Sequence, residues 1–408
     1  MRAIRCASLF DGEWFTTGPA TVFIDWEVIA GIEPGHPAVD SSVELVDLGD
    51  ATVLPGLIDT HVHLVTDSVP RALDLVDGYS DGEIDAVITR SLAAQLAGGV
   101  TTVRDLGDRR FVVVDRRDDQ RARRARVVEP TIAASGPPLT APRGHCWYLG
   151  GEVDGPLEIE NALRERIDRR VDVVKVMASG GMNTTGSDVM VPQFSLAEMR
   201  LIVELAHAGG VAVTAHAHAL AAVEVAVAAG VDGLEHCSCL TPQGVVLPDE
   251  LLVALARRGI PIGAGMMVGG PEAFDDAPPN IIGSMLQMGL TPSSWIAARR
   301  DLVGRMHAAG ARFVGGSDAG IEPYLGHGLM RSGLEFLASA GATVPQALAA
   351  GTSLAAAACG LGSRKGFVRK GFDADLLVVD GLFGSDLAPL GRVRQVMVDG
   401  VFAGAGSR

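Results

Sequence analysis

Five side chains that commonly bind metal ions stand in or at the ends of apolar runs: His61, His63, His216, His236 and Asp318. Side chains two residues apart in a β-strand point to the same face, so His61 and His63 can meet one ion. Imidazole nitrogens together with a carboxylate suit zinc and similar divalent ions, whereas calcium prefers oxygen ligands throughout. We therefore predict a metal centre and expect zinc in it.

Lys175 lies within the apolar run VDVVKVMAS and is one of only three lysines in the chain. An isolated ammonium group is costly to bury, and burial lowers the lysine pKa and leaves a nucleophilic amine. Such an amine can add carbon dioxide to form a carbamate, whose two oxygens can bridge two cations. The alternatives are a Schiff base with a carbonyl substrate, as in a lyase, and a salt-bridged structural lysine.

Eight short apolar runs alternate with helical segments, a rhythm that is typical of parallel βαβ units. The runs cover residues 52–63, 99–106, 126–135, 171–179, 210–218, 231–237, 260–268 and 311–318. Several helical segments end in glycine, where helices commonly stop. The pattern predicts an α/β fold, a distorted (β/α)8 TIM barrel over residues 53–364.

In such a barrel, the loops that follow the strands build the active-site face. The two longest, residues 180–195 and 269–295, are predicted to select the substrate. Met266, Met267 and Phe274 near the second loop favour an apolar substrate group.

Both ends of the chain carry short alternating runs that are broken by glycine, proline and aspartate, and this pattern predicts antiparallel strands. We expect residues 1–52 and 365–408 to form one small β-sandwich domain beside the barrel.

Composition excludes several classes of protein. With 48% hydrophobic and 20% charged residues the chain is not intrinsically disordered, and its net charge of −15 disfavours nucleic acid and anionic lipid. The five cysteines form no CxxC pair, so we expect reduced thiols and a cytoplasmic protein. Neither a signal peptide nor a membrane span is predicted.

The chain resembles the amidohydrolase superfamily of binuclear metal hydrolases. PGLIDTHVHL, the lysine of the fourth predicted strand, two later strand-end histidines and GGSDAG match its pattern in order. KVMASGG, QFS and AHAH are similar to the branch that holds dipeptidases, prolidase-like enzymes and relatives of imidazolonepropionase.

The resemblance implies two divalent ions, most simply Zn²⁺. By analogy, His61 and His63 hold one ion with Asp318, His216 and His236 hold the other, and carboxylated Lys175 bridges both.

The implied reaction is hydrolysis of an amide C–N bond by a metal-bridging hydroxide, with Asp318 as general base and then acid. A dipeptide or an N-acyl amino acid is the expected substrate, and cyclic amides, carbamates or ureas are the alternative. The resemblance also implies a small-molecule substrate and a homo-oligomer.

Three further histidines are candidates for contact with substrate: His145, His218 and His327. His145 resembles a family position that hydrogen-bonds the substrate carbonyl or carboxylate. His218 shares a strand face with His216, where some related dipeptidases have tyrosine, and His327 follows Asp318 at the expected pocket mouth. At the end of the second run, Arg104 and Asp105 are expected to form an ion pair that supports the site.

Overall fold

Each of the eight apolar runs contains a β-strand in the computed structural model, which describes residues 1–123, 127–263, 282–283, 285–286 and 289–404. The strands are β7 (Leu57–Val62), β8 (Val100–Asp105), β9 (Thr131–Ala134), β10 (Val173–Met177), β11 (Ala212–Ala219), β12 (Gly233–Thr241), β14 (Ile262–Gly263) and β15 (Phe313–Val314). Met266, Met267, Phe274 and most of the predicted loop 269–295 lie outside the described residues.

These strands form two parallel sheets, in the orders β7-β8-β9 and β10-β11-β12-β14-β15, and β13 (Gly244–Val245) pairs antiparallel with β12. Backbone hydrogen bonds join the outer strands. Leu139 donates to the carbonyl of Lys175 at 2.9 Å, and Asp318 donates to the carbonyl of His61 at 2.8 Å. The segment that follows β9 is therefore held beside β10, and the segment that follows β15 is held beside β7.

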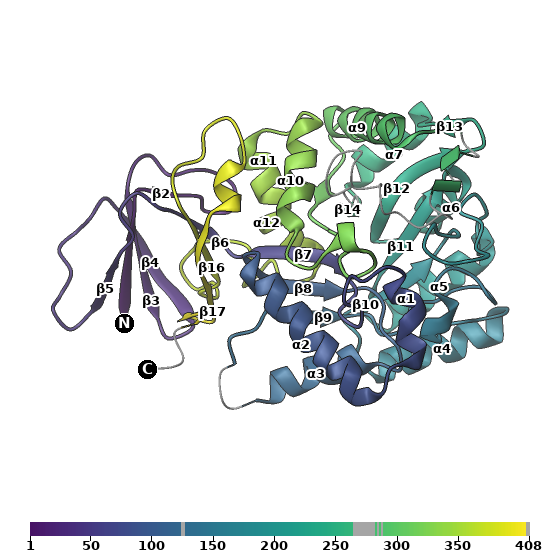
Figure 1. Ribbon diagram of the computed structural model, residues 1–408, viewed down its shortest axis with the longest axis horizontal. Coiled ribbons are helices and arrows are strands. Elements are labelled where there is room, and N and C mark those ends of the chain that lie inside the picture. The colour runs from purple at the N-terminus through teal and green to yellow at the C-terminus, as the bar shows by residue number, and fades with distance from the viewer. Residues whose placement is uncertain (124–126, 264–281, 284, 287–288, 405–408) are drawn as a thin grey trace.

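Helices follow most of these strands and lie outside the sheets (Figure 1). They are α1 (Ala72–Leu75), α2 (Asp81–Ala97), α3 (Val112–Ala122), α4 (Pro156–Asp168), α5 (Leu196–Ala208), α6 (Leu220–Ala229), α7 (Asp249–Arg258), α9 (Pro292–Ala308), α10 (Met330–Ser339), α11 (Val344–Ala350) and α12 (Ser353–Ala358). Capping boxes begin α2 at Ser80 and α5 at Ser195, and Gly98 and Gly209 end the same helices. Local sequence thus sets where these helices begin and end.

The strands of the two chain ends lie side by side at the left of Figure 1. One sheet has the order β4-β3-β1-β5, formed by β1 (Arg2–Cys6), β3 (Ala20–Asp25), β4 (Val28–Pro34) and β5 (Glu44–Asp47). The other has the order β18-β17-β16-β6-β2, formed by β2 (Ser8–Leu9), β6 (Thr52–Pro55), β16 (Leu376–Val379), β17 (Val393–Val398) and β18 (Val401–Phe402). Residues of both sheets, among them Ile4, Val22, Leu376 and Met397, share one apolar cluster.

Two strand pairs differ from the antiparallel pairing predicted for the chain ends. β1 pairs with β5 in parallel, and β2 pairs with β6 in parallel. The reason is that neither pair is joined by a tight turn, and antiparallel pairing is required only of strands that a hairpin connects.

Gly56 divides the first predicted strand in two. β6 pairs with β16 of the terminal sheet, whereas β7 pairs with β8. A Cβ atom at Gly56 would lie 2.2 Å from Oγ1 of Thr101, so only glycine allows the two backbones to approach here.

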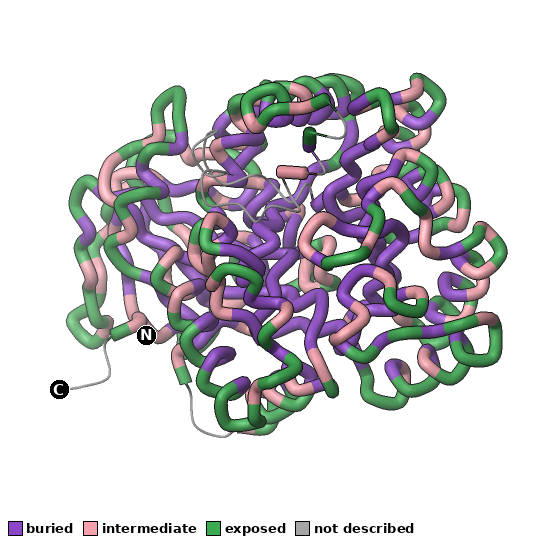
Figure 2. Tube along the Cα trace, turned by 45° about the vertical axis from the view of Figure 1, so that its right-hand side comes forward, coloured by how far each residue is buried: buried purple, intermediate pink, exposed green. Residues whose placement is uncertain are grey.

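The buried residues follow the strands through the interior of the molecule, and exposed residues mark the outer helices and turns (Figure 2). Within the described part of the chain, no helix combines the length and the hydropathy that crossing a bilayer requires.

Candidate metal centre

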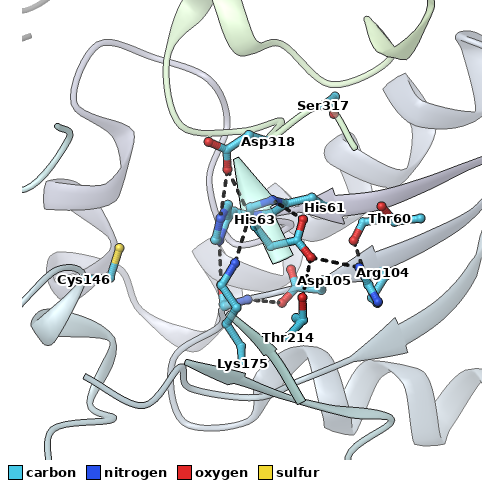
Figure 3. Close-up of polar contacts among 12 residues, drawn as sticks. Thr60, His61, His63, Arg104, Asp105, Cys146, Lys175, Thr214, Ser317 and Asp318 are labelled. Carbon is cyan, nitrogen blue, oxygen red and sulfur yellow. Dashed lines mark hydrogen bonds and ion pairs between the residues drawn. The ribbon is translucent and has the colours of Figure 1, made fainter. Parts of the chain in front are cut away.

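One small cavity collects the predicted metal ligands. Its lining includes all six of them, together with the candidate substrate contacts His145 and His218. Lining residues that were not predicted are Cys146, Met177, Met182, Asn183 and Ile321. Strand ends that are far apart in the sequence therefore meet at one point, and Figure 3 shows His61, His63, Lys175 and Asp318 gathered there.

The first group of candidate ligands is His61, His63 and Asp318. The Nε2 atoms of His61 and His63 lie 3.2 and 3.3 Å from Oδ1 of Asp318. This oxygen is buried and has no hydrogen-bond partner among the described residues. Nδ1 of His63 lies 3.2 Å from the carbonyl oxygen of Gly107. A carbonyl oxygen can only accept a hydrogen bond, so in the neutral ring Nδ1 carries the proton and Nε2 carries the lone pair. Two imidazoles and a carboxylate thus converge as the ligands of a cation do.

The second group is His216, His218 and His236, whose ligand atoms lie within 4.8 Å of one another. Nε2 of His216 lies 3.2 Å from the carbonyl oxygen of Gly180, and Nδ1 of His218 lies 2.8 Å from Oγ of Ser238. Burial lowers the pKa of His216 and His236 well below the ordinary value and that of His218 to about 3. The three rings are therefore neutral, which is the form that binds a metal ion.

Lys175 is buried at 1% exposure, as its apolar neighbours predict. Its Nζ lies 3.3 Å from Nε2 of His61, and its side chain points toward His61 and Asp318 (Figure 3). Burial lowers the pKa of Lys175 although the carboxylates of Glu235 and Asp318 oppose that shift. The amine thus lies beside the first group, and its lowered pKa favours the neutral form.

The backbone is strained at two of the candidate ligands. His236 and Asp318 have φ angles of 67° and 58°, in the left-handed region that residues other than glycine rarely adopt. Asp59 holds the segment before Asp318, because Ser317 donates its backbone N–H (3.0 Å) and its hydroxyl (2.5 Å) to the Asp59 carboxylate. Burial raises the pKa of Asp59 to about 6.

The predicted partner of Arg104 was wrong. Arg104 pairs with Glu235 at 3.0 Å and not with Asp105, which accepts the backbone N–H groups of Leu64 and Gly107. Consecutive side chains of a β-strand point to opposite faces, so Asp105 faces the turns that follow β7 and β8 while Arg104 faces Glu235. Sequence analysis missed Glu235. Its signal was a carboxylate directly before His236 in a run that is otherwise apolar.

His145 and His327 have different surroundings. Nδ1 of His145 lies 2.8 Å from Oγ1 of Thr184, and its ring centroid lies 4.6 Å from that of His216. His327 does not belong to the cavity lining; its Nε2 donates to the carbonyl of Thr66 at 2.9 Å and its Nδ1 lies 3.3 Å from the side-chain nitrogen of Gln95. The predicted contact of His327 with substrate stays a prediction.

Comparison with known proteins identifies the family. The model of the family described as "Amidohydrolase family" matches residues 52–403. The chain belongs to the amidohydrolase family. The resemblance noted in the sequence is thereby confirmed. Members are hydrolases of amide bonds that act on small molecules and generally use divalent metal ions.

Ochratoxinase from Aspergillus niger is similar to this amidohydrolase at 30% identity over 217 residues, which are 46% of this chain and 43% of ochratoxinase. The match therefore spans less than half the length of that curated relative. The solved structure of A. niger ochratoxinase aligns with 100% of this chain and 98% of its own, with a TM-score of 0.81 at 22% identity.

Two dipeptidase-like structures are also similar. A Xaa-Pro dipeptidase with bound methionine covers 98% of this chain and 99% of its own, with a TM-score of 0.84 at 24% identity. A putative prolidase from Bifidobacterium longum covers 99% of this chain and 94% of its own, with a TM-score of 0.77 at 26% identity. The neighbours are of the TIM-barrel type, with mixed α/β content and a parallel sheet, as predicted for this chain.

Proposed function

We propose that this amidohydrolase uses two metal ions to cleave the amide bond of a dipeptide or an N-acyl amino acid. The observation that carries the proposal is that two groups of potential metal ligands, with Lys175 beside them, share one buried cavity. The ligand types favour zinc in both positions.

In this proposal, His61, His63 and Asp318 hold one ion, and His216 and His236 hold the other. Oδ1 of Asp318 supports this fit, because this buried oxygen lies within 3.3 Å of Nε2 of both histidines and has no hydrogen-bond partner among the described residues. Lys175 links the two groups as its carbamate, since a buried neutral amine is able to add carbon dioxide.

When bound, the two ions polarise the scissile carbonyl and lower the pKa of the attacking water. Burial alone would raise the pKa of Asp318, but the neighbouring rings of His61 and His63 hold it well below the ordinary value. The carboxylate is therefore anionic, accepts the proton of the water and returns it to the leaving nitrogen.

His145 and His218 are proposed to bind the substrate. In each ring Nδ1 has a hydroxyl partner, Thr184 for His145 and Ser238 for His218. Nε2 of His218 is therefore the atom that is left for the carbonyl or carboxylate of a substrate. Nε2 of His145 lies 3.5 Å from Sγ of Cys146, a weak hydrogen-bond partner that a substrate oxygen would replace. Met177, Met182 and Ile321 add apolar surface to the same cavity.

The proposed architecture places this centre at the strand ends of a distorted (β/α)8 barrel over residues 53–364. The hydrogen bonds that join β9 to β10 through Leu139, and β15 to β7, support closure of the barrel. Residues 1–52 and 365–408 are proposed as a separate β-sandwich domain, and the apolar cluster shared by the terminal sheets supports this division.

The test is amine release by zinc-reconstituted protein from a panel of dipeptides and N-acyl amino acids, with chelator-stripped protein as control. We expect metal-dependent release and about two ions per chain. Protein that binds no divalent metal would refute the proposal. Metal binding without release from the panel would move the search to cyclic amides, carbamates and ureas. Trapping of Lys175 by borohydride with a keto substrate would support the lyase alternative instead.

A further inference from the structure

Glu235 forms a buried polar cluster with three residues from other strands of the interior. It lies in β12 at 0% exposure, and its partners are Arg104 in β8, Thr214 in β11 and His61 in β7. Since β7 and β8 belong to one sheet and β11 and β12 to the other, the cluster links the two sheets.

The two carboxylate oxygens of Glu235 have separate roles. Oε1 accepts hydrogen bonds from Nη2 of Arg104 at 3.0 Å and from Oγ1 of Thr214 at 2.7 Å. Oε2 lies 3.1 Å from Nδ1 of His61. Neither Oε2 nor this Nδ1 has a hydrogen-bond partner elsewhere among the described residues. Oε2 of Glu235 and Nδ1 of His61 are therefore available to interact with each other.

The surrounding backbone is shaped to admit this carboxylate. A Cβ atom at position 263 in β14 would lie 2.1 Å from Oε2 of Glu235, so Gly263 provides the space that the oxygen occupies. Arg104 is fixed on its other edges, because Nε donates to the carbonyl of Thr60 at 2.7 Å and Nη1 to that of Ala358 at 3.1 Å. The position of Glu235 is therefore set from several sides.

We propose that Glu235 is a positioning residue that keeps the proton of His61 on Nδ1, so that the lone pair of Nε2 is directed at the metal centre. A ligating histidine commonly donates its second ring N–H to a carboxylate, and this contact selects the tautomer and the orientation of the ring. The inference rests on the proposed function, because it assigns His61 to a metal ion.

Glu235→Gln is the decisive variant, since it has nearly the same shape. Its carbonyl oxygen must accept from Arg104 and Thr214, so its amide nitrogen takes the place of Oε2 and faces Nδ1 of His61. Two donors cannot bond to each other, and His61 is driven to carry its proton on Nε2. We expect the affinity for one of the two ions to fall by about 10- to 100-fold.

Thr214→Val is the matched control, because it removes a donor to Oε1 and leaves the contact between Oε2 and His61 in place. Affinities for Zn²⁺ are measured by competition with a chromophoric chelator, and unfolding of the metal-free proteins by circular dichroism. We expect the control to change the metal affinity less than about threefold. Equal losses of affinity in both variants would overturn the proposal and assign Glu235 to packing alone.

The tautomer is also observed directly in metal-free protein labelled with ¹⁵N-histidine, where long-range ¹H–¹⁵N spectra distinguish protonated Nδ1 from protonated Nε2. His61→Asn assigns the signals. Protonated Nε2 of His61 in the wild-type protein would refute the inference even if Glu235→Gln does not fold. If the wild-type protein binds no Zn²⁺, the proposed function fails; if it binds two ions and Glu235→Gln binds both equally well, only this inference fails.

Discussion

Nζ of Lys175 lies 3.3 Å from Nε2 of His61, although 114 residues separate them in the chain. The contact joins the first strand of one parallel sheet to the first strand of the other. A buried amine therefore lies next to a candidate metal ligand.

Lys175→Met keeps the length and apolar fit of the side chain but cannot add carbon dioxide. We expect the zinc content to fall below two ions per chain and the rate of amide hydrolysis to fall by about 100-fold or more, since two-ion stabilisation contributes several kcal/mol. Metal analysis and amine release measure both effects. Lys370→Met, at an exposed lysine, is the control. Two bound ions and an unchanged rate in Lys175→Met would argue against a bridging role.

Asp318→Asn removes the charge of the proposed proton carrier with little change of shape. We expect kcat to fall by about 10²- to 10⁴-fold, the usual contribution of a general base. Steady-state kinetics at saturating substrate give this value, and metal analysis of the same samples separates lost chemistry from lost ions. Asp25→Asn, at the exposed end of β3, is expected to leave kcat unchanged. Comparable activity in both variants would exclude Asp318 as the base.

The stability of the metal-free protein is expected to depend on pH through His327. Burial lowers the pKa of His327 to about 4 from the ordinary 6.5. Between pH 4 and pH 6.5 the unfolded chain binds a proton on this ring that the folded chain does not. The contribution of the neutral ring to the free energy of unfolding is therefore fully present above pH 6.5 and is lost as the pH falls toward 4.

His327→Gln is expected to reduce the pH dependence of the free energy of unfolding by up to about 1.4 kcal/mol per pH unit in that window. Urea denaturation at several pH values between 4.5 and 7.5 measures the slope. His36→Gln, at an exposed histidine, controls for the loss of an imidazole. The expectation is wrong if the slope of His327→Gln equals that of the wild-type protein.

Gly56→Ala tests the point at which the chain passes from the terminal sheet to β7. The new Cβ would lie 2.2 Å from Oγ1 of Thr101, so we expect a loss of about 1–3 kcal/mol in the free energy of unfolding, as overpacked interiors show. Gly82→Ala in α2 is the matched control, because its added Cβ has no atom within 4 Å apart from its chain neighbours and the backbone of its own helix. Its stability is expected to be unchanged or up to about 1 kcal/mol higher. Chemical denaturation measures the free energy of unfolding of both variants. A loss in Gly56→Ala no larger than that in Gly82→Ala would contradict the prediction.

Local patterns in the sequence were enough to predict several features. Strand alternation placed His61 and His63 on one face, and apolar neighbours predicted that Lys175 is buried. The capping box that begins α5 at Ser195 has a local cause of the same kind, a serine three residues before a glutamate. These features depend on side-chain direction and on hydrogen bonds within a few residues, so the sequence alone contains their cause.

The sequence did not reveal where the apolar run 52–63 is divided. Both halves are buried strands, and pairing with β16 or with β8 is equally compatible with burial. The choice is made by contact between Gly56 and Thr101, which are far apart in the chain. Positive φ angles at His236 and Asp318 also escaped prediction, because surrounding structure rather than residue type imposes them.

The sequence by itself determined which chemical groups are available and which of them end neighbouring strands. Only the tertiary structure decided their partners: Glu235 rather than Asp105 for Arg104, and Asp59 for Ser317. Glu235 and Arg104 are 131 residues apart, and a buried charge accepts whichever opposite charge the packing of the sheets brings within reach. That choice depends on the geometry of the whole interior, which no local pattern encodes.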